Sequence, residues 1–137
     1  MVVRRSRYSR DYSSHYRPID LISEKPLGGT MTITCGEATI RLLAKYGIDV
    51  VFGIPGVHTL EFCAGLGEDG PIQHIQVRNE QGAGFMAEGY ARATGKPAVA
   101  LVISGPGVTN AATAIGQAWA DSLPVILLSA EAASDTI

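Results

Sequence analysis

The stretch RNEQGAGFMAEGYARATGKPAVALVISGPGVTN, residues 78–110, decides the fold of this chain. Its first part, residues 78–95, is rich in glycine and alanine, carries Glu80 near its start and predicts a helix. AVALVIS, residues 98–104, is an apolar run of strand length, and GPGVTN, residues 105–110, predicts a tight loop. A strand this apolar is typical of a parallel sheet that helices cover on both faces.

The same alternation continues on both sides of this stretch. Helical patterns precede and follow it over residues 35–47, 55–70 (after an initial turn) and 111–122, and strand patterns over residues 49–54, 72–77 and 124–130. The runs 49–54 and 124–130 are apolar and predict buried strands, and Gly47 predicts the end of the first helix. Helices that alternate with strands predict an α/β fold, a doubly wound and mostly parallel sheet with helices on both faces. The chain of 137 residues is long enough for one such domain or part of one.

Composition narrows the class of protein. The net charge of −2 argues against a nucleic-acid partner, and no apolar run reaches the roughly 18 residues of a membrane span. Cys35 and Cys63 form neither a CxxC motif nor a disulfide framework, so we expect a cytoplasmic protein. His15, His58 and His74 lack the spacing of metal ligands, so the sequence predicts no metal site in this chain.

Residues 1–30 differ from the rest of the chain in charge. They hold six of the 11 basic side chains and three of the 13 acidic ones, with little apolar periodicity, and predict a disordered basic tail. The acids Asp11, Asp20 and Glu24 weaken the alternative of a transit peptide, which is nearly free of acid. Because Met31 directly precedes the first periodic segment, the stretch could also be an upstream region misread as coding.

Three segments follow strands of the predicted sheet, where ligands of such folds bind: GIPGVHT (53–59), RNEQ (78–81) and SGPGVTN (104–110). Alone, the Pro55–Gly56 turn is most simply a strand-to-helix connection, although glycine also lets a ligand approach the backbone. His58, just past that turn, is either a surface or capping residue or a proton-transfer group facing a cleft.

Glu80 and Asn110 each have a structural and a functional interpretation. Glu80 could be an acid favoured by the helix dipole, or a carboxyl partly buried among small residues that shares a proton with a heteroaromatic nitrogen. Asn110 could cap the following helix, or its amide could bind a ligand. SGPGVTN is neither a Walker A loop nor a GxGxxG motif. Trp119 is predicted to be a core or interface residue.

The chain resembles the thiamine-diphosphate enzymes over about residues 32–130. The resemblance rests on three segments that occur in this order: GIPGVHT, residues 78–110 and AWADSLPVILLSA. The similarity is to the domain that binds the aminopyrimidine ring of the cofactor. It is strongest to the acetolactate synthase and 2-oxo-acid decarboxylase branch, and GIPGVHTLE is similar to the version in 5-guanidino-2-oxopentanoate decarboxylase-like members. The resemblance assigns residues 31–137 to this pyrimidine-binding domain, truncated at its C-terminal end, with the central and diphosphate-binding domains absent.

The resemblance also implies roles for single residues. The family's glutamate, matched by Glu80, hydrogen-bonds a ring nitrogen of the aminopyrimidine and thereby helps to activate the cofactor for attack on a 2-oxo acid. The remaining matches are cofactor contacts at Pro55, Gly56, Pro106 and Asn110, substrate contacts at Val57 and His58, and interface positions at Gln81, Gly84 and Phe85. The valine at position 57 stands where some decarboxylases carry a polar residue, so that role is vacant.

The same resemblance implies a homodimer or homotetramer formed through the Glu80 helix. It also implies thiamine diphosphate as cofactor, with Mg²⁺ held by a domain that this chain lacks. EDG at residues 68–70 is not the family's GDG motif for the diphosphate, so we expect no activity from the chain alone. Three alternatives stay open: a subunit of a split enzyme with a separate diphosphate-binding chain, a non-catalytic assembly or regulatory module that pairs through residues 82–93, and a doubly wound domain for an unrelated ligand.

Overall fold

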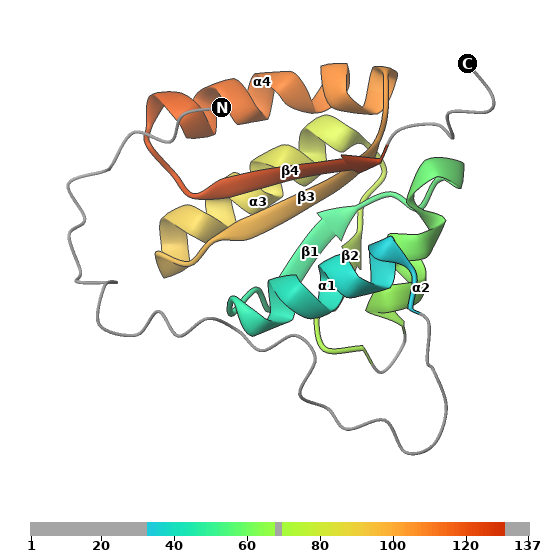
Figure 1. Cartoon of the computed structure of the whole chain (residues 1–137). Coiled ribbons are helices and arrows are strands. Elements are labelled where there is room, and N and C mark those ends of the chain that lie inside the picture. Colours follow the sequence, from blue (N-terminus) through green and yellow to red (C-terminus); the bar gives the residue numbers. More distant parts are fainter. Residues whose placement is uncertain (1–32, 68–69, 131–137) are drawn as a thin grey trace. The chain divides into compact units, whose positions relative to one another are not determined.

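The computed structural model describes residues 33–67 and 70–130, so the tail predicted over residues 1–30 and the end of the chain after residue 130 lie outside the described part. Helices and strands alternate along the described residues (Figure 1). Their bounds are α1 Cys35–Lys45, β1 Val50–Gly53, the 3-10 helix η1 Val57–Thr59, α2 Leu60–Leu66, β2 Gln73–Gln76, α3 Glu80–Thr94, β3 Ala98–Ile103, α4 Pro106–Ala120 and β4 Val125–Ala130.

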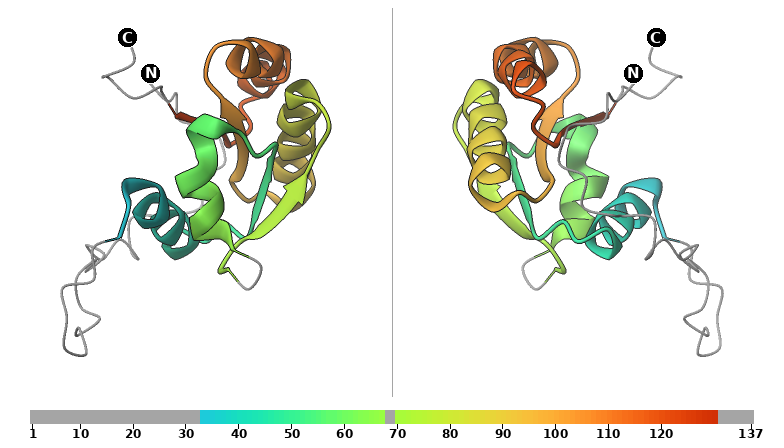
Figure 2. Two further views of the ribbon diagram at one scale, coloured as in Figure 1. Left: turned by 90° about the vertical axis from the view of Figure 1, so that its right-hand side faces the viewer. Right: turned by 90° about the vertical axis from the view of Figure 1, so that its left-hand side faces the viewer.

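The predicted α/β fold is confirmed. The strands form one sheet in the order β2-β1-β3-β4, and every neighbouring pair is parallel. Figure 2 shows the two helical layers, with α3 and α4 on one side of the sheet and α1 and α2 on the other. The chain therefore crosses from the edge strand β2 over β1 by way of α3 before it enters β3.

The core has two halves, one on each face of the sheet. Phe52 and Ala100 pack with the buried alanines of α3, whereas Val51 and Val99 pack with Ile40 and the other apolar residues beneath α1 and α2. Successive residues of β1 and β3 alternate between these two clusters, because side chains along a strand point to opposite faces. Both central strands are therefore buried on both sides, as the apolar run of residues 98–104 predicts.

The prediction of a buried strand over residues 124–130 is wrong in one respect. β4 begins one residue later than predicted and ends at the predicted residue, but its residues are only partly buried, and Ile126 is 40% exposed. In the part of the sheet that the structure describes, β4 lies at the edge and pairs only with β3. Position in the sheet, rather than the apolarity of the strand, sets its burial.

Helix ends follow local signals. The Thr34 Oγ1 accepts a hydrogen bond from the backbone N–H of Glu37 at 3.2 Å, and the Glu37 Oε2 accepts one from the N–H of Thr34 at 3.1 Å, a capping box that starts α1. The predicted stop at Gly47 is confirmed, since Gly47 follows the C-cap with φ +81°. Gly95 ends α3 in the same left-handed region, with φ +70°.

An exposed polar cluster ties the amino end of the sheet to α3. The Tyr90 hydroxyl donates to Asp49 Oδ1 at 2.6 Å, and Lys96 Nζ donates to Asp49 Oδ2 at 2.8 Å. The hydrogen bond from Lys96 has the largest effect in lowering the pKa of the Asp49 carboxyl, and the bond from Tyr90 lowers it further. Asp49 directly precedes β1, so the cluster connects the start of this central strand to α3 and to the residue that follows its C-cap.

This cluster should make stability depend on pH in the acidic range. A folded pKa below the usual 3.8 means that Asp49 contributes stability above pH 3.8, and that this contribution is lost as the pH falls through the folded pKa. The melting temperature of Asp49→Asn should therefore lie below that of the wild type at neutral pH, and the gap should close in acid. The gap should be small, because the side chains are exposed. A pH-independent gap in thermal melts would contradict this.

Candidate functional site

The three loop segments singled out in the sequence meet at the carboxyl ends of the strands. GIPGVHT follows β1, Glu80 begins α3 after β2, and Ser104 follows β3. His58 Nδ1 lies 2.9 Å from Ser104 Oγ, which joins the first segment to the third. Asn110 Nδ2 donates to Glu80 Oε2 at 3.1 Å, which joins the second to the third. The structure thus links residues that are 30 to 46 positions apart in the sequence.

Glu80 lies half-buried in the first turn of α3. Asn79 caps this helix, since its side-chain oxygen accepts from the backbone N–H of Gln81 at 2.9 Å. Because Asn79 provides the cap, Glu80 has its carboxylate free for another contact. Its Oε2 accepts the Asn110 bond, and Oε1 has no hydrogen-bond partner among residues 33–67 and 70–130. One oxygen of the carboxylate is therefore held in place and the other is available.

Asn110 is not a helix cap, and GPGVTN is not a loop. The N-cap of α4 is Gly105, and Pro106 occupies the first helical position, so Asn110 lies one turn inside the helix. Gly105 has φ +68°, a conformation that favours glycine, and proline is common at the start of a helix. The helix begins five residues earlier than predicted, and this early start places the Asn110 amide beside Glu80.

The first turn of α4 also lies close to Glu80. A Cβ atom added at Gly107 would stand 3.7 Å from Glu80 Cγ and 3.0 Å from Ile103 Cγ1. Gly107 is buried, whereas Pro106 is exposed at the mouth of the helix. A larger residue at position 107 would contact the Glu80 side chain, so the glycine leaves room for the carboxylate.

Thr59, which the sequence analysis missed, holds the Pro55–Gly56 turn. Its fully buried hydroxyl accepts from the Gly56 N–H at 3.0 Å and donates to the Gly56 carbonyl at 3.1 Å. On the other side of the turn, a Cβ added at Gly56 would stand 2.2 Å from Ile103 Cγ2. Gly56 is thus pressed between Thr59 and β3. Thr59 is the third residue after the N-cap Gly56, the position from which a side chain can bond back to the N-cap N–H, and this spacing is the local signal for its role.

Thr59→Val should loosen this turn while keeping the volume of the side chain. The valine removes both side-chain hydrogen bonds to Gly56 at a buried site and leaves the backbone bond from the Thr59 N–H to the Gly56 carbonyl, and we expect a loss of about 1–2 kcal/mol in the free energy of unfolding. The amide proton of Gly56 should exchange faster with solvent deuterium than in the wild type. Thr59→Ser keeps the hydroxyl and should retain slow exchange at Gly56. Unchanged exchange in Thr59→Val would show that the hydroxyl does not hold the turn.

The two predicted substrate positions lie in η1, directly after the turn. Val57 is 82% exposed, and the His58 side chain is exposed apart from its contact with Ser104. Leu60, which begins α2, is a further exposed apolar residue beside them. The start of this helix therefore presents an apolar surface next to one histidine.

The predicted interface positions fall on two sides of α3. Gln81 and Phe85 are exposed, whereas Gly84 is buried and a Cβ added there would stand 2.6 Å from Ala114 Cβ of α4. The glycine therefore allows the two helices of this chain to pack closely. The exposed side of α3 also carries Met86, which is 44% exposed. Trp119 is 60% exposed, so the interpretation as a core residue is wrong.

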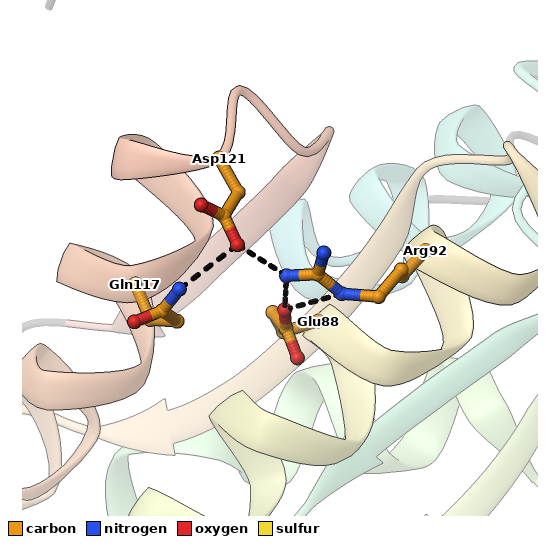
Figure 3. Close-up of polar contacts among 4 residues, drawn as sticks. All are labelled: Glu88, Arg92, Gln117 and Asp121. Carbon is orange, nitrogen blue, oxygen red and sulfur yellow. Dashed lines mark hydrogen bonds and ion pairs between the residues drawn. The ribbon is translucent and has the colours of Figure 1, made fainter.

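A polar cluster joins α3 and α4 near their far ends (Figure 3). Arg92 Nε donates to Glu88 Oε1 at 3.0 Å, and its Nη2 pairs with both Glu88 and Asp121. Gln117 Nε2 donates to Asp121 Oδ2 at 2.8 Å. Glu88 is nearly buried, so the Arg92 pair compensates for the burial of its charge. The helices that carry Glu80 and Asn110 are thus fixed at both ends of their contact.

A polar hollow of about 210 Å³ opens between the beginnings of α3 and α4, lined by Asn79, Gln81, Thr109, Asn110 and Thr113. In the described ranges, no group of three or more His, Cys, Asp or Glu side chains could hold a metal ion. None of the helices within these ranges combines the length and apolarity that crossing a membrane requires.

Comparison with known proteins matches this chain to one family. The family described as thiamine pyrophosphate enzyme, N-terminal TPP binding domain, matches residues 33–137. AruI of Pseudomonas aeruginosa, named as a probable 2-ketoarginine decarboxylase, is 62% identical over 104 residues, which are 76% of this chain and 18% of AruI. The large subunit of acetolactate synthase isozyme 1 of Escherichia coli is 44% identical over 104 residues, 76% of this chain and 18% of the relative.

A solved structure supports the same assignment. A Mycobacterium smegmatis chain described as a thiamin diphosphate-dependent enzyme superposes with a TM-score of 0.67 at 28% identity. The match covers 76% of this chain and 20% of that one. The chain thus spans about a fifth of the length of the proteins it matches. From the family match, the sequence identity and the shared fold, we conclude that this chain belongs to the thiamine pyrophosphate enzymes and corresponds to their N-terminal cofactor-binding domain.

Proposed function

We propose that this chain supplies the pyrimidine-binding part of a thiamine-diphosphate-dependent 2-oxo-acid decarboxylase or acetolactate synthase-like enzyme, with Glu80 as the residue that activates the cofactor. The observation that carries the proposal is the pairing of Glu80 with Asn110 at 3.1 Å. It fixes one carboxylate oxygen and leaves Oε1 to share a proton with a ring nitrogen. The relatives named as a decarboxylase and as acetolactate synthases support this choice of reaction class.

The residues around Glu80 fit an aromatic ring with nitrogen atoms. Gly107 leaves space beside the carboxylate, and Thr59 and Ile103 hold Gly56 in a fixed turn at the end of β1. Pro55 and Pro106, both exposed, provide rigid apolar surface at the two turns. When bound, thiamine diphosphate supplies the carbon nucleophile and the electron sink for decarboxylation. In this proposal Glu80 holds and moves the proton, whereas Asn110, Gly56 and the prolines position the ring.

Other parts of the working enzyme would come from outside the described residues. The diphosphate needs cationic or hydrogen-bond-donating partners, and Mg²⁺ needs oxygen ligands such as carboxylates. A separate domain or a separate chain would provide both. Val57 and His58 would face a 2-oxo acid substrate. A homodimer or homotetramer would form through the exposed side of α3, where Gln81, Phe85 and Met86 lie and where a Cβ at Gly82 or Gly89 would meet no neighbour in this chain.

The proposal is tested by giving the chain its missing parts. Residues 33–137 would replace the matching N-terminal segment of AruI, and decarboxylation of 2-ketoarginine by this chimera would be measured with thiamine diphosphate and Mg²⁺. We expect activity from the chimera and none from the purified chain under the same conditions, since the sequence of the chain contains no GDG motif for the diphosphate. A chimera that folds but does not turn over would contradict the proposed function. Turnover by the chain alone would contradict its dependence on other domains.

A further inference from the structure

We infer that Ser104 is a positioning residue that fixes the ring of His58, so that Nε2 is the nitrogen offered to a ligand. The two side chains make one hydrogen-bond contact, with 2.9 Å between His58 Nδ1 and Ser104 Oγ. The two residues lie 46 positions apart and follow the neighbouring parallel strands β1 and β3. The sheet, rather than local sequence, brings them together.

The backbone beneath both residues is held firmly. Thr59, next to His58, is fully buried and makes both side-chain bonds to Gly56. Ser104 follows the last residue of β3 directly and is half-buried. The positions from which the two side chains extend are therefore set by the fold. The exposed His58 ring would sample several rotamers if nothing held it, and the Ser104 hydroxyl restricts it to one.

The 2.9 Å distance fits either neutral tautomer of His58, and we assign the Ser104 hydroxyl as the donor because it has no other hydrogen-bond partner among the described residues. A serine hydroxyl that donates to Nδ1 leaves the imidazole proton on Nε2, since a neutral ring carries one N–H and one acceptor nitrogen. Nε2 itself has no hydrogen-bond partner in the described part of the chain. His58 then presents an N–H donor, which suits a carboxylate or carbonyl oxygen. That such an oxygen belongs to a 2-oxo acid rests on the proposed function, whereas the tautomer rests on the Ser104 contact with the hydroxyl as donor.

Nitrogen NMR of the imidazole ring tests the inference on the full chain without cofactor. Long-range proton–nitrogen correlation spectra would be recorded at about pH 9, where an ordinary imidazole is neutral, and His58→Gln would assign the ring signals. In the wild type we expect separate nitrogen shifts with the proton on Nε2. In Ser104→Ala both nitrogens should move toward a common average, and Ser104→Thr, which keeps the hydroxyl, should retain the wild-type shifts.

Two results would overturn the inference: ring shifts that stay the same in Ser104→Ala, or a wild-type ring protonated on Nδ1. Backbone amide spectra of the variants show whether each one keeps the fold, and Ser104→Thr is the control that alters the same site while keeping the hydroxyl. Because the measurement needs no cofactor, it can fail while the AruI chimera is active. Equally, an inactive chimera would leave the tautomer result unaffected, so the two proposals fail separately.

Discussion

Replacing Glu80 with glutamine should lower the decarboxylation rate of the AruI chimera by about 10²–10⁴-fold, the usual contribution of a general acid or base. Glutamine keeps the length and shape of the side chain, and its carbonyl oxygen can still accept the hydrogen bond that Asn110 donates. What it loses is the ability to hold and release a proton. The loss should therefore appear in turnover and leave the melting temperature almost unchanged.

Glu61→Gln is the matched control for this experiment. Glu61 is an exposed glutamate in α2 that makes no hydrogen bond or ion pair within residues 33–67 and 70–130. The same chemical change at position 61 should leave both turnover and stability at wild-type values. If Glu80→Gln also retained near wild-type turnover in a chimera that is otherwise active, Glu80 would have no part in proton transfer.

The second large effect concerns the contact between α3 and α4. Gly84→Ala adds a methyl group that would stand 2.6 Å from the Ala114 Cβ, far inside van der Waals contact. The helices must separate to accept it, and we expect a loss of about 2–3 kcal/mol in the free energy of unfolding, as for overpacked cores. Urea unfolding of the purified chain, followed by circular dichroism, measures this loss.

The facing helix offers the matched control. A Cβ added at Gly116 of α4 meets no heavy atom within 4 Å, so Gly116→Ala gains helix propensity without a clash. It should stabilise the chain by about 0.5–1 kcal/mol. Glycine-to-alanine substitutions in these two packed helices should thus change the free energy of unfolding in opposite directions. Equal effects at positions 84 and 116 would show that α3 and α4 are not in close contact.

Most of the fold could be predicted from the sequence because its signals are local. The apolar run of residues 98–104 gives β3, and Gly47 and Gly95 stop the helices before them by a backbone conformation that glycine favours. The prediction of a loop over GPGVTN is wrong because proline and glycine are common both in turns and in the first turn of a helix. Only the packing of α4 against β3 and α3 decides between these two outcomes.

The candidate site could be predicted only in part, for a different reason. Glu80 stands out because it opens a helix of small residues, and the Pro55–Gly56 turn stands out by composition. The partners Asn110 and Ser104 depend on contacts across 30 and 46 residues, and no local pattern specifies these contacts. Likewise, the partial burial of the strand over residues 125–130 depends on its neighbours in the sheet.

The division of the core into two clusters governs how substitutions combine. Val51 and Phe52 are adjacent in the sequence, yet they belong to different clusters on opposite faces of the sheet. Phe52 shares its cluster with Ala87, which is 35 positions away along the chain. Energetic coupling follows contact rather than sequence distance, so changes at residues 51 and 52 should be nearly additive, whereas changes at residues 52 and 87 should not. During evolution, one face of the sheet can be repacked while the face that carries Glu80 and Asn110 is left unchanged.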